Sequence, residues 1–582
     1  MKQELVQPYA YVALRLPSDA TIVIQVLPNT TISIGKYGAF QANNIVGRPY
    51  HLTFEIRDTV TGDGRAQSGL RVVPAAELYA DIKDEAPETP TEAEGGNPGA
   101  GGDGVEYEIV GQNGEVVMRT NRQILDDPNS QIMTMDEIEA FKAQSTGSGK
   151  ELIAKILESH SALDQKTAFA LAKYTLRKTK KYLRRFAVLP LDVPTLARWI
   201  LTDKEPMKIM ELREEILSLI GSWSNVHCTP STTSLDGDGV EVKGGRWLVI
   251  DETAGLLVAS MAEKMAILHP PDEDGLEAEC KRSSNHEADT INGHDELEAP
   301  TTQDGAAPHL HDPRPRKASR LGTANTITLI HANAQPNLSL LKYFHFDAFN
   351  PPKSHPLESH LRTLSWLQLL SPDDDLGYTE PEIASEETIQ SWKSGKRSNY
   401  YRKRRRWGRI KTIVDETRAG GFDGLIVASV MSPVSILRNT VSLLRGAAQV
   451  VIYSPTVESL VELSDYYSTG RRTAFLTNPP DSNLMPTDDF PLDPTLLLAP
   501  TIQTARCRSW QVLPGRTHPF MTGRGGSEGY VFTATRVLPA EGKVEARGKF
   551  KRRKVDGDMA RSSSQQGNPA SGGSGTIEVD TT

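Results

Sequence analysis

A short apolar run leads straight into a helical segment at residues 244–265, where cofactor-binding α/β domains carry a glycine-rich turn. Trp247–Ile250 is typical of a buried parallel strand, and helix-forming residues follow from Glu252. Between them only Gly255 would let the backbone approach a phosphate or nucleoside closely, whereas such turns usually carry two or three glycines. The chain therefore keeps the architecture of a nucleotide site without its loop, which predicts a role other than catalysis.

Length and composition set broad limits. The 582 residues suffice for several domains at about 150 residues each. The net charge of −9 is modest, but residues 272–304 hold eleven acids and two bases, so basic surfaces elsewhere remain available to a polyanion. Three widely spaced cysteines favour a reducing compartment over a disulfide framework or thiolate metal site. The N-terminus lacks an apolar signal core, and no apolar run approaches the ~18 residues that cross a bilayer, so we expect a soluble intracellular protein without a membrane partner.

The first 225 residues change from strand-like to helical patterns. Residues 1–125 hold short β-branched runs separated by turn residues, which predict an N-terminal β-barrel interrupted by a disordered acidic insertion at 82–105. Residues 126–225 predict a helical connector with a long basic helix at 164–186. The other helices of the connector are expected at 135–144, 149–158, 193–201 and 206–221.

Residues 245–540 alternate strands with helices, which predicts a doubly wound α/β domain. Its parallel strands are expected at Trp247–Ile250, Thr326–Ile330, Gly424–Ala428, Gln449–Tyr453 and Arg472–Leu476, and its helices at Glu252–Ile267, Leu338–Phe344, Ser432–Leu444 and Thr456–Tyr466. We expect Ser509–Leu513 and Tyr530–Val537 to pair antiparallel and close the sheet at its edge. The acidic segment 270–321 and the tail 541–582, which carries a basic cluster, are expected to be disordered.

A basic helix in the connector is a candidate nucleic-acid surface. Seven bases lie within residues 173–186, and no acid occurs between Asp164 and Asp192. Lys and Arg neutralise phosphates, and Tyr can stack or donate a hydrogen bond. The alternative is a solvated helix face with core tyrosines. The candidate RNA-binding residues are Lys173, Arg177, Lys178, Lys180, Lys181, Tyr182, Arg184 and Arg185.

A second basic tract, residues 393–411, contains ten bases, three aromatic residues and no acid. Its core would serve either as a nuclear-import signal or as an RNA contact, and the sequence does not separate the two. Tyr400, Tyr401 and Trp407 exceed what import needs and suit stacking on bases or docking of a partner. The candidate residues are Arg402, Lys403, Arg404, Arg405 and Arg406. The tail cluster 547–554 is more simply an import signal, so we expect a nuclear location.

Two short motifs resemble catalytic loops but lack residues that those loops require. Gly147-Ser-Gly-Lys150 lacks the first glycine of a phosphate-binding loop, and Glu151 replaces its hydroxyl residue. Asn478-Pro-Pro-Asp481 resembles the Asn-Pro-Pro-aromatic loop of amino-methylating enzymes, but it follows the fifth expected strand and ends in Asp481. The thirteen histidines show no metal-ligand spacing. We therefore expect no catalytic residue, no metal and no cofactor.

Seven motifs together make the chain resemble the non-catalytic subunit of the eukaryotic tRNA adenine N1-methyltransferase that modifies the T-loop. They are Asn29–Gly38, Gly47–Phe54, Ser148–Lys155, Lys166–Tyr174, Lys180–Tyr182, Asp251–Leu256 and Met261–Met265. The resemblance implies an α+β multidomain protein with an N-terminal β-barrel, a helical connector and a C-terminal degenerate Rossmann-like methyltransferase fold. It also implies tRNA as a partner, and a catalytic sister subunit in a two-plus-two heterotetramer.

Three departures from an active methyltransferase agree with the resemblance. The first loop lacks its glycines, the second strand ends in His331-Ala-Asn333 without a carboxylate for a ribose, and the third ends in Ala428–Pro433 without an aspartate. Asp251 and Glu252 remain open to two interpretations, as cofactor-binding acids or as first-turn helix acids. Two alternative functions also stay open: a stand-alone S-adenosylmethionine-dependent RNA methyltransferase, and a general RNA-binding factor in translation initiation.

Overall fold

The computed structural model describes residues 5–60, 66–79, 109–110, 116–118, 131–144, 149–161, 168–229, 245–269, 324–352, 354–480, 486–513, 516–520 and 527–538. All of them lie in one compact unit, Met1–Leu538. Within these residues, no helix combines the length and the apolar character needed to cross a membrane. The expected insertions at 82–105 and 270–321 and the tail lie outside the described residues.

The N-terminal part forms an open antiparallel sheet, and the predicted closed barrel is not confirmed. Its five strands run in the order β2-β1-β9-β5-β6, so β2 and β6 form its edges. The strands are β1 (Tyr11–Arg15), β2 (Thr21–Gln25), β5 (Thr53–Val60), β6 (Ala66–Val72) and β9 (Arg185–Pro190), while β3 (Thr31–Ser33) pairs with β4 (Ala39–Gln41) and β7 (Ile109–Val110) with β8 (Val116–Met118). Inward side chains such as Leu14, Phe54 and Phe186 form one buried cluster.

β9 starts at Arg185 and Phe186, the two residues predicted to end the basic helix. The run Phe186-Ala-Val-Leu189 is short and apolar, a pattern that periodicity alone does not assign to helix or strand. In the structure it lies between β1 and β5 and pairs antiparallel with both. The connector therefore contributes the central strand of the N-terminal sheet.

The helices of the connector form two groups. The first comprises α2 (Met135–Gln144), α3 (Lys150–Glu158) and α4 (Ala168–Tyr182), and the second comprises α5 (Val193–Asp203) and α6 (Glu214–Trp223). The predicted start of α2 is confirmed, because Thr134 and Glu137 exchange the two hydrogen bonds of a capping box. α5 and α6 share a core with the C-terminal sheet.

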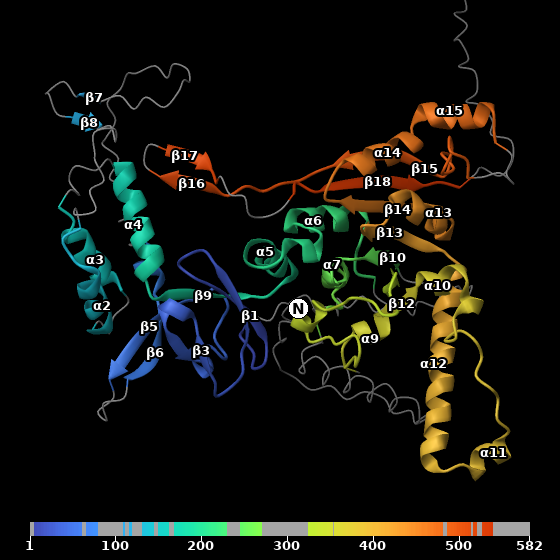
Figure 1. The fold of residues 1–582 in the computed structure, drawn as a ribbon, viewed down its shortest axis with the longest axis horizontal. Helices are drawn as coiled ribbons and strands as arrows, with labels where there is room; N and C mark the ends of the chain where they lie inside the picture. Colours follow the sequence, from blue (N-terminus) through green and yellow to red (C-terminus); the bar gives the residue numbers. More distant parts are fainter. Residues whose placement is uncertain are drawn as a thin grey trace, which may run out of the picture. The chain divides into compact units, whose positions relative to one another are not determined.

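The C-terminal part is a seven-stranded, Rossmann-like sheet in the order β12-β11-β10-β13-β14-β18-β15 (Figure 1). The strands are β10 (Arg246–Asp251), β11 (Thr326–His331), β12 (Leu361–Ser365), β13 (Phe422–Ala428), β14 (Leu444–Ser454), β15 (Leu497–Gln503) and β18 (Tyr530–Arg536). The first five are parallel, and β18 runs antiparallel to both neighbours. The winding reverses between β10 and β13, and in doubly wound sheets ligands bind at the carboxyl ends beside this point.

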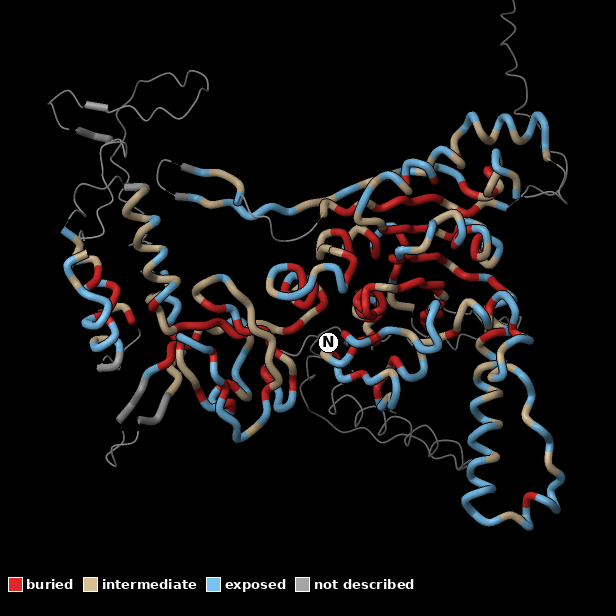
Figure 2. The backbone as a smooth tube through the Cα atoms, viewed as in Figure 1, coloured by how far each residue is buried: buried red, intermediate tan, exposed pale blue. Residues whose placement is uncertain are grey.

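Both faces of the sheet are covered, and Figure 2 shows its central strands as buried. Trp247 and Val249 face a core that includes α5, α6 and α7 (Leu256–Lys264). Leu248 and Ile250 face the other core, with α13 (Pro433–Thr440) and α14 (Glu458–Tyr466). Alternate side chains of β10 thus point into two different apolar cores, which explains why its sequence is continuously apolar.

Two predictions about the end of the domain are wrong. Arg472–Leu476 lies in a helix, α15 (Thr469–Thr477), which Ser468 caps by accepting a hydrogen bond from the Arg471 amide. The antiparallel partner of β16 (Trp510–Leu513) is β17 (Arg516–Pro519), whereas β18 lies inside the sheet between β14 and β15. The sequence pattern does not predict β15, because Pro500 interrupts its run of strand-forming residues. A proline is tolerated here because β15 is an edge strand and its register with β18 shifts between Leu498 and Thr501.

Candidate functional site

The carboxyl end of β10 holds Asp251, whose carboxylate is turned back onto the chain. Its oxygens accept hydrogen bonds from the Thr253 amide and hydroxyl, both at 2.6 Å, and from the Val258 amide at 3.0 Å. Burial raises the pKa of Asp251, while these hydrogen bonds and one from Gly255 oppose the rise. Asp251 therefore occupies the amides at the start of α7 that an external anion would use.

Gly255 faces protein at the place where a ligand would lie. It has a left-handed backbone (φ +91°), and a Cβ added there would lie 3.2 Å from both Cα and Cδ2 of Leu338. The Leu340 amide donates to the Ala254 carbonyl at 3.1 Å, and Leu338, Leu340 and Leu341 are buried. The segment after β11 thus fills the space in front of the single glycine.

The neighbouring strand ends supply no acid for a ribose or for catalysis. β11 ends at His331, whose Nδ1 lies 2.7 Å from the Asn333 carbonyl, and no acid occurs from there to Leu338. After β13, the Val430 amide donates to the Glu252 carboxylate at 2.7 Å, which ties the loop to the end of β10. Asp251 and Glu252 hence bond within the chain. Neither is a first-turn helix acid, because α7 begins at Leu256 and its first turn holds no acid, so that interpretation is wrong. That the chain binds no cofactor stays a prediction, now with a physical reason.

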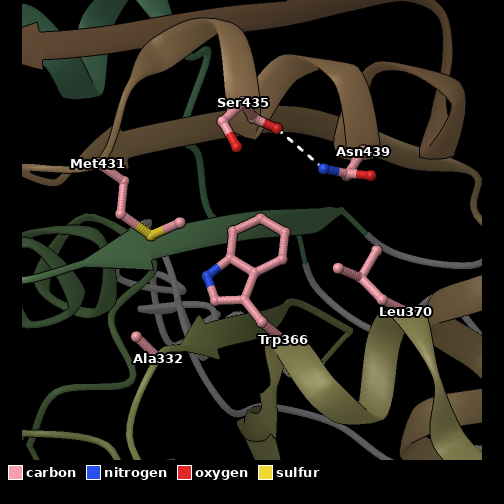
Figure 3. Close-up of a pocket in the computed structure, with 6 residues that line it drawn as sticks. All are labelled: Ala332, Trp366, Leu370, Met431, Ser435 and Asn439. Carbon is pink, nitrogen blue, oxygen red and sulfur yellow. Dashed lines mark hydrogen bonds between the residues drawn. The ribbon is translucent and has the colours of Figure 1, made fainter.

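A cavity of about 220 Å³ is the second feature of this region, and Figure 3 shows the six residues that line it. It lies beyond the ends of β11, β12 and β13, and its lining residues are Ala332, Trp366, Leu370, Met431, Ser435 and Asn439. Asn439 Nδ2 donates to the Ser435 carbonyl at 2.9 Å. Since none of the six side chains titrates near neutral pH, the lining offers no general acid or base.

α4 presents a basic stripe whose position the N-terminal sheet fixes. Lys173, Arg177 and Lys181 are exposed and follow one another at intervals of four residues, so they share one face of the helix. The Tyr37 hydroxyl donates to the Lys180 carbonyl at 2.7 Å, and the Lys180 side chain pairs with Asp19. The stripe is thus presented by a helix anchored at its C-terminal end.

The other predicted bases of this segment are more enclosed. Lys178 lies 4.8 Å from the centre of the Tyr174 ring, and burial lowers its pKa. The half-buried Arg184 donates to the Tyr37 carbonyl at 3.3 Å, and Tyr182 is buried among α2 and α3. These residues therefore present less surface to a ligand than Lys173, Arg177 and Lys181 do.

Arg185 lies in β9, so its predicted place on the basic helix is wrong. Its side chain is 5% exposed, pairs with Glu55 at 3.0 Å and also contacts Glu77. Partial burial alone would raise the pKa of Glu77, but hydrogen bonds from Arg71 and Lys150 and the charge of Arg185 lower it to about 2. Arg185 is therefore part of a structural ion-pair network. Lys150, the lysine of the motif that resembles a phosphate-binding loop, belongs to the same network.

The second basic tract forms α12 (Ser394–Arg418), a helix of 25 residues that starts beside α11 (Glu386–Ser391) and ends against the sheet domain (Figure 1). Arg402, Lys403, Arg405 and Arg406 are exposed. Arg404 instead pairs with Glu380 at 3.3 Å. Trp407 Nε1 donates to the Tyr378 carbonyl at 3.0 Å, so this aromatic residue packs against the chain's own segment.

The sequence profile of the Gcd10p family matches residues 5–393, well over half of the chain. The chain belongs to the Gcd10p family. The match covers the N-terminal sheet, α4 and the filled crevice, and it ends one residue before α12 begins.

Curated relatives of this Gcd10p-family chain share one name, tRNA (adenine(58)-N(1))-methyltransferase non-catalytic subunit trm6. The protein from Aspergillus fumigatus is 48% identical, over 98% of this chain and 98% of its own. The protein from Schizosaccharomyces pombe is 27% identical, over 93% of this chain and 94% of its own. A solved tRNA (m1A58) methyltransferase, TrmI from Aquifex aeolicus, aligns with 92% of this chain and 100% of its own at 9% identity and a TM-score of 0.34. At that TM-score the alignment supports no conclusion about this chain, so the assignment of the fold depends on the strand order alone.

The filling of the crevice is the feature that sequence patterns miss in this Gcd10p-family chain. Leu338–Phe344 is apolar and helix-like in composition, yet it forms only a short 3-10 turn at Leu341–Phe344. Its role depends on contact with Gly255, about 80 positions earlier in the chain. The one available signal is the missing glycine loop itself, because a turn without these glycines does not keep space for a ligand to approach the backbone.

Proposed function

We propose that this chain is the non-catalytic, tRNA-binding subunit of a tRNA N1-methyladenosine methyltransferase that acts on the T-loop adenine. The observation that carries the proposal is an intact doubly wound sheet whose ligand crevice is filled by its own residues, with Leu338 packed on Gly255. The name of the relative that is 48% identical over nearly the whole chain supports the same reading. The chain then contributes RNA binding and assembly, and a sister subunit contributes the cofactor and the chemistry.

The exposed bases of α4 and α12 support the tRNA-binding part of the proposal. Lys173, Arg177 and Lys181 share one exposed face of α4. Lysine and arginine side chains bind phosphates, and such contacts fix an RNA without reading its sequence. On α12, bases remain exposed although Arg404 is used internally.

The β16–β17 hairpin is the surface we assign to the sister subunit. Trp510 and Val512 alternate along β16, so they share one face, and their exposed fractions are 57% and 72%. Phe520 follows β17 and is 46% exposed. Exposed aromatic and aliphatic side chains on a strand pair favour packing against another chain. A two-plus-two heterotetramer and a nuclear location belong to the proposal as well.

Reconstitution tests the proposed function directly. The chain and a catalytic sister subunit from the same organism are expressed separately and together, and methyl transfer to tRNA is measured. We expect a stable complex that methylates tRNA, with neither subunit active alone. Methyl transfer by this chain alone would support a stand-alone enzyme instead. Failure to co-purify, with tRNA binding retained, would favour a general RNA-binding factor.

A further inference from the structure

We propose that one face of α12, formed by Arg402, Arg405, Arg406 and Arg409, binds the phosphate backbone of tRNA and is not an import signal. We call this surface the outer arginine face. The inference rests on the proposed function, because it takes tRNA as the RNA that the complex binds.

Helix geometry gathers the four arginines on one side. They lie at positions i, i+3, i+4 and i+7, which covers one face and about 10 Å of helix length. All four are exposed, and Arg402 donates a hydrogen bond to Asn399 Oδ1 at 2.9 Å. Within the part of the chain that the structure describes, none of the four makes an ion pair. The outer arginine face is therefore a dense positive surface without an internal counter-charge.

The opposite side of α12 is occupied by the chain itself. Trp407 Nε1 donates to the Tyr378 carbonyl at 3.0 Å, and the Tyr378 hydroxyl donates to Asp415 at 2.8 Å. Arg404 pairs with Glu380 at 3.3 Å, so an acid balances this inward base. The fold thus separates the bases of one continuous tract. Arg404 on the inner side has an acidic partner, whereas the arginines on the outer side face solvent.

The fold of α12 argues against a receptor that reads a linear peptide. The backbone amides and carbonyls of 402–406 are used within a 25-residue helix. The helix ends in the core, where Val414 is fully buried, and the Arg246 side chain donates to the Glu416 carbonyl at 3.1 Å. Extending 402–406 into a peptide groove would break the helix and release the packed inner side. A polyanion needs neither change, since it binds the side chains as they stand.

Salt dependence gives the expected size of the effect. Each phosphate neutralised adds about 0.9 to the slope of log affinity against log salt. The three arginines replaced in the test below therefore add roughly 2.7 to the slope, which is about a 40-fold further loss of affinity between 50 and 200 mM salt. Arginines that point to solvent without contacting RNA would add almost nothing to this slope.

The test compares two triple variants in the complete complex with the sister subunit. One carries R402Q, R405Q and R409Q on the outer arginine face. The control carries K393Q, K396Q and K411Q, which remove the same charge from exposed lysines outside the outer arginine face. Affinity for unmodified tRNA is measured from 50 to 200 mM salt, and thermal melting confirms that both variants are folded.

We expect the outer-face variant to bind tRNA more weakly, with a salt slope lower by about 3, while the control keeps most of the wild-type slope. An unchanged slope, or an equal loss in both variants, would overturn the inference. So would an outer-face variant that binds tRNA normally but no longer accumulates in the nucleus, because that result assigns the face to import. In each of these cases the unsubstituted complex still binds and methylates tRNA; if it does not, the proposed function itself is wrong.

Discussion

Replacing Gly255 by alanine tests whether this glycine is retained to pack against Leu338. A Cβ at this position meets Leu338 at 3.2 Å on a backbone with φ +91°. The left-handed conformation costs a non-glycine residue about 1–2 kcal/mol. Crowding of a packed core adds about 1–3 kcal/mol, because Leu338 and Leu341 are buried and have little room to move. The expected loss in the free energy of unfolding is therefore about 2–5 kcal/mol.

Gly421→Ala is the matched control for backbone strain. Gly421 also has a left-handed backbone, at φ +80°, but an added Cβ meets only the Arg246 side chain, at 3.6 Å. The difference between the two variants isolates the crowding, about 1–3 kcal/mol. At about 2–4 °C per kcal/mol for a domain of 150–250 residues, Gly255→Ala should melt several degrees below Gly421→Ala.

Differential scanning calorimetry of the complete complex measures both variants, and methylation at low temperature reports function. We expect the folded Gly255→Ala complex to methylate tRNA at the wild-type rate, because no cofactor lies against this glycine. Equal melting temperatures for the two variants would refute the packing argument. A normal melting temperature with lost methylation would mean that Gly255 faces a ligand after all.

Three further predictions follow from the surfaces and the ion pairs. Charge reversal of Arg177 and Lys181 to Glu should weaken tRNA binding and lower its salt slope by about 2 without disrupting the complex, and an unchanged slope in a binding titration would return α4 to a solvated helix face. Replacing Trp510 and Val512 by Ser should abolish co-purification with the sister subunit while this chain stays folded, and an intact complex would move the interface to another surface. The pKa of Glu77 is lowered to about 2 from 4.5, so its contribution to stability is present above about pH 4.5 and is lost as the pH falls towards 2. The melting temperatures of the wild type and a Glu77→Gln variant should therefore converge in this range. A constant difference between them would contradict the ion-pair network.

The sequence predicts the parts of the fold that depend on local patterns. The buried strand at Trp247–Ile250, the connector helices expected at 135–144, 149–158 and 193–201, and the capped start of α2 are confirmed, because burial period and capping residues lie within a few positions of each other. The doubly wound sheet follows from the alternation of such segments.

The features that escape prediction depend on distant partners. Arg185 resembles its basic neighbours, and only its pairing with Glu55, 130 residues earlier, makes it structural. β15 contains Pro500, and its register with β18 gives no local signal. The tract 402–406 is uniform in sequence, and only the ion pair with Glu380 separates Arg404 from its exposed neighbours.

The absence of a cofactor site in this chain is the central claim, and calorimetric titration of S-adenosylmethionine into the reconstituted complex tests it most directly. The claim predicts one binding site for each catalytic sister subunit and none from this chain, because Asp251 is bonded to α7 and Leu338 fills the space at Gly255. Two sites for each pair of subunits would contradict it.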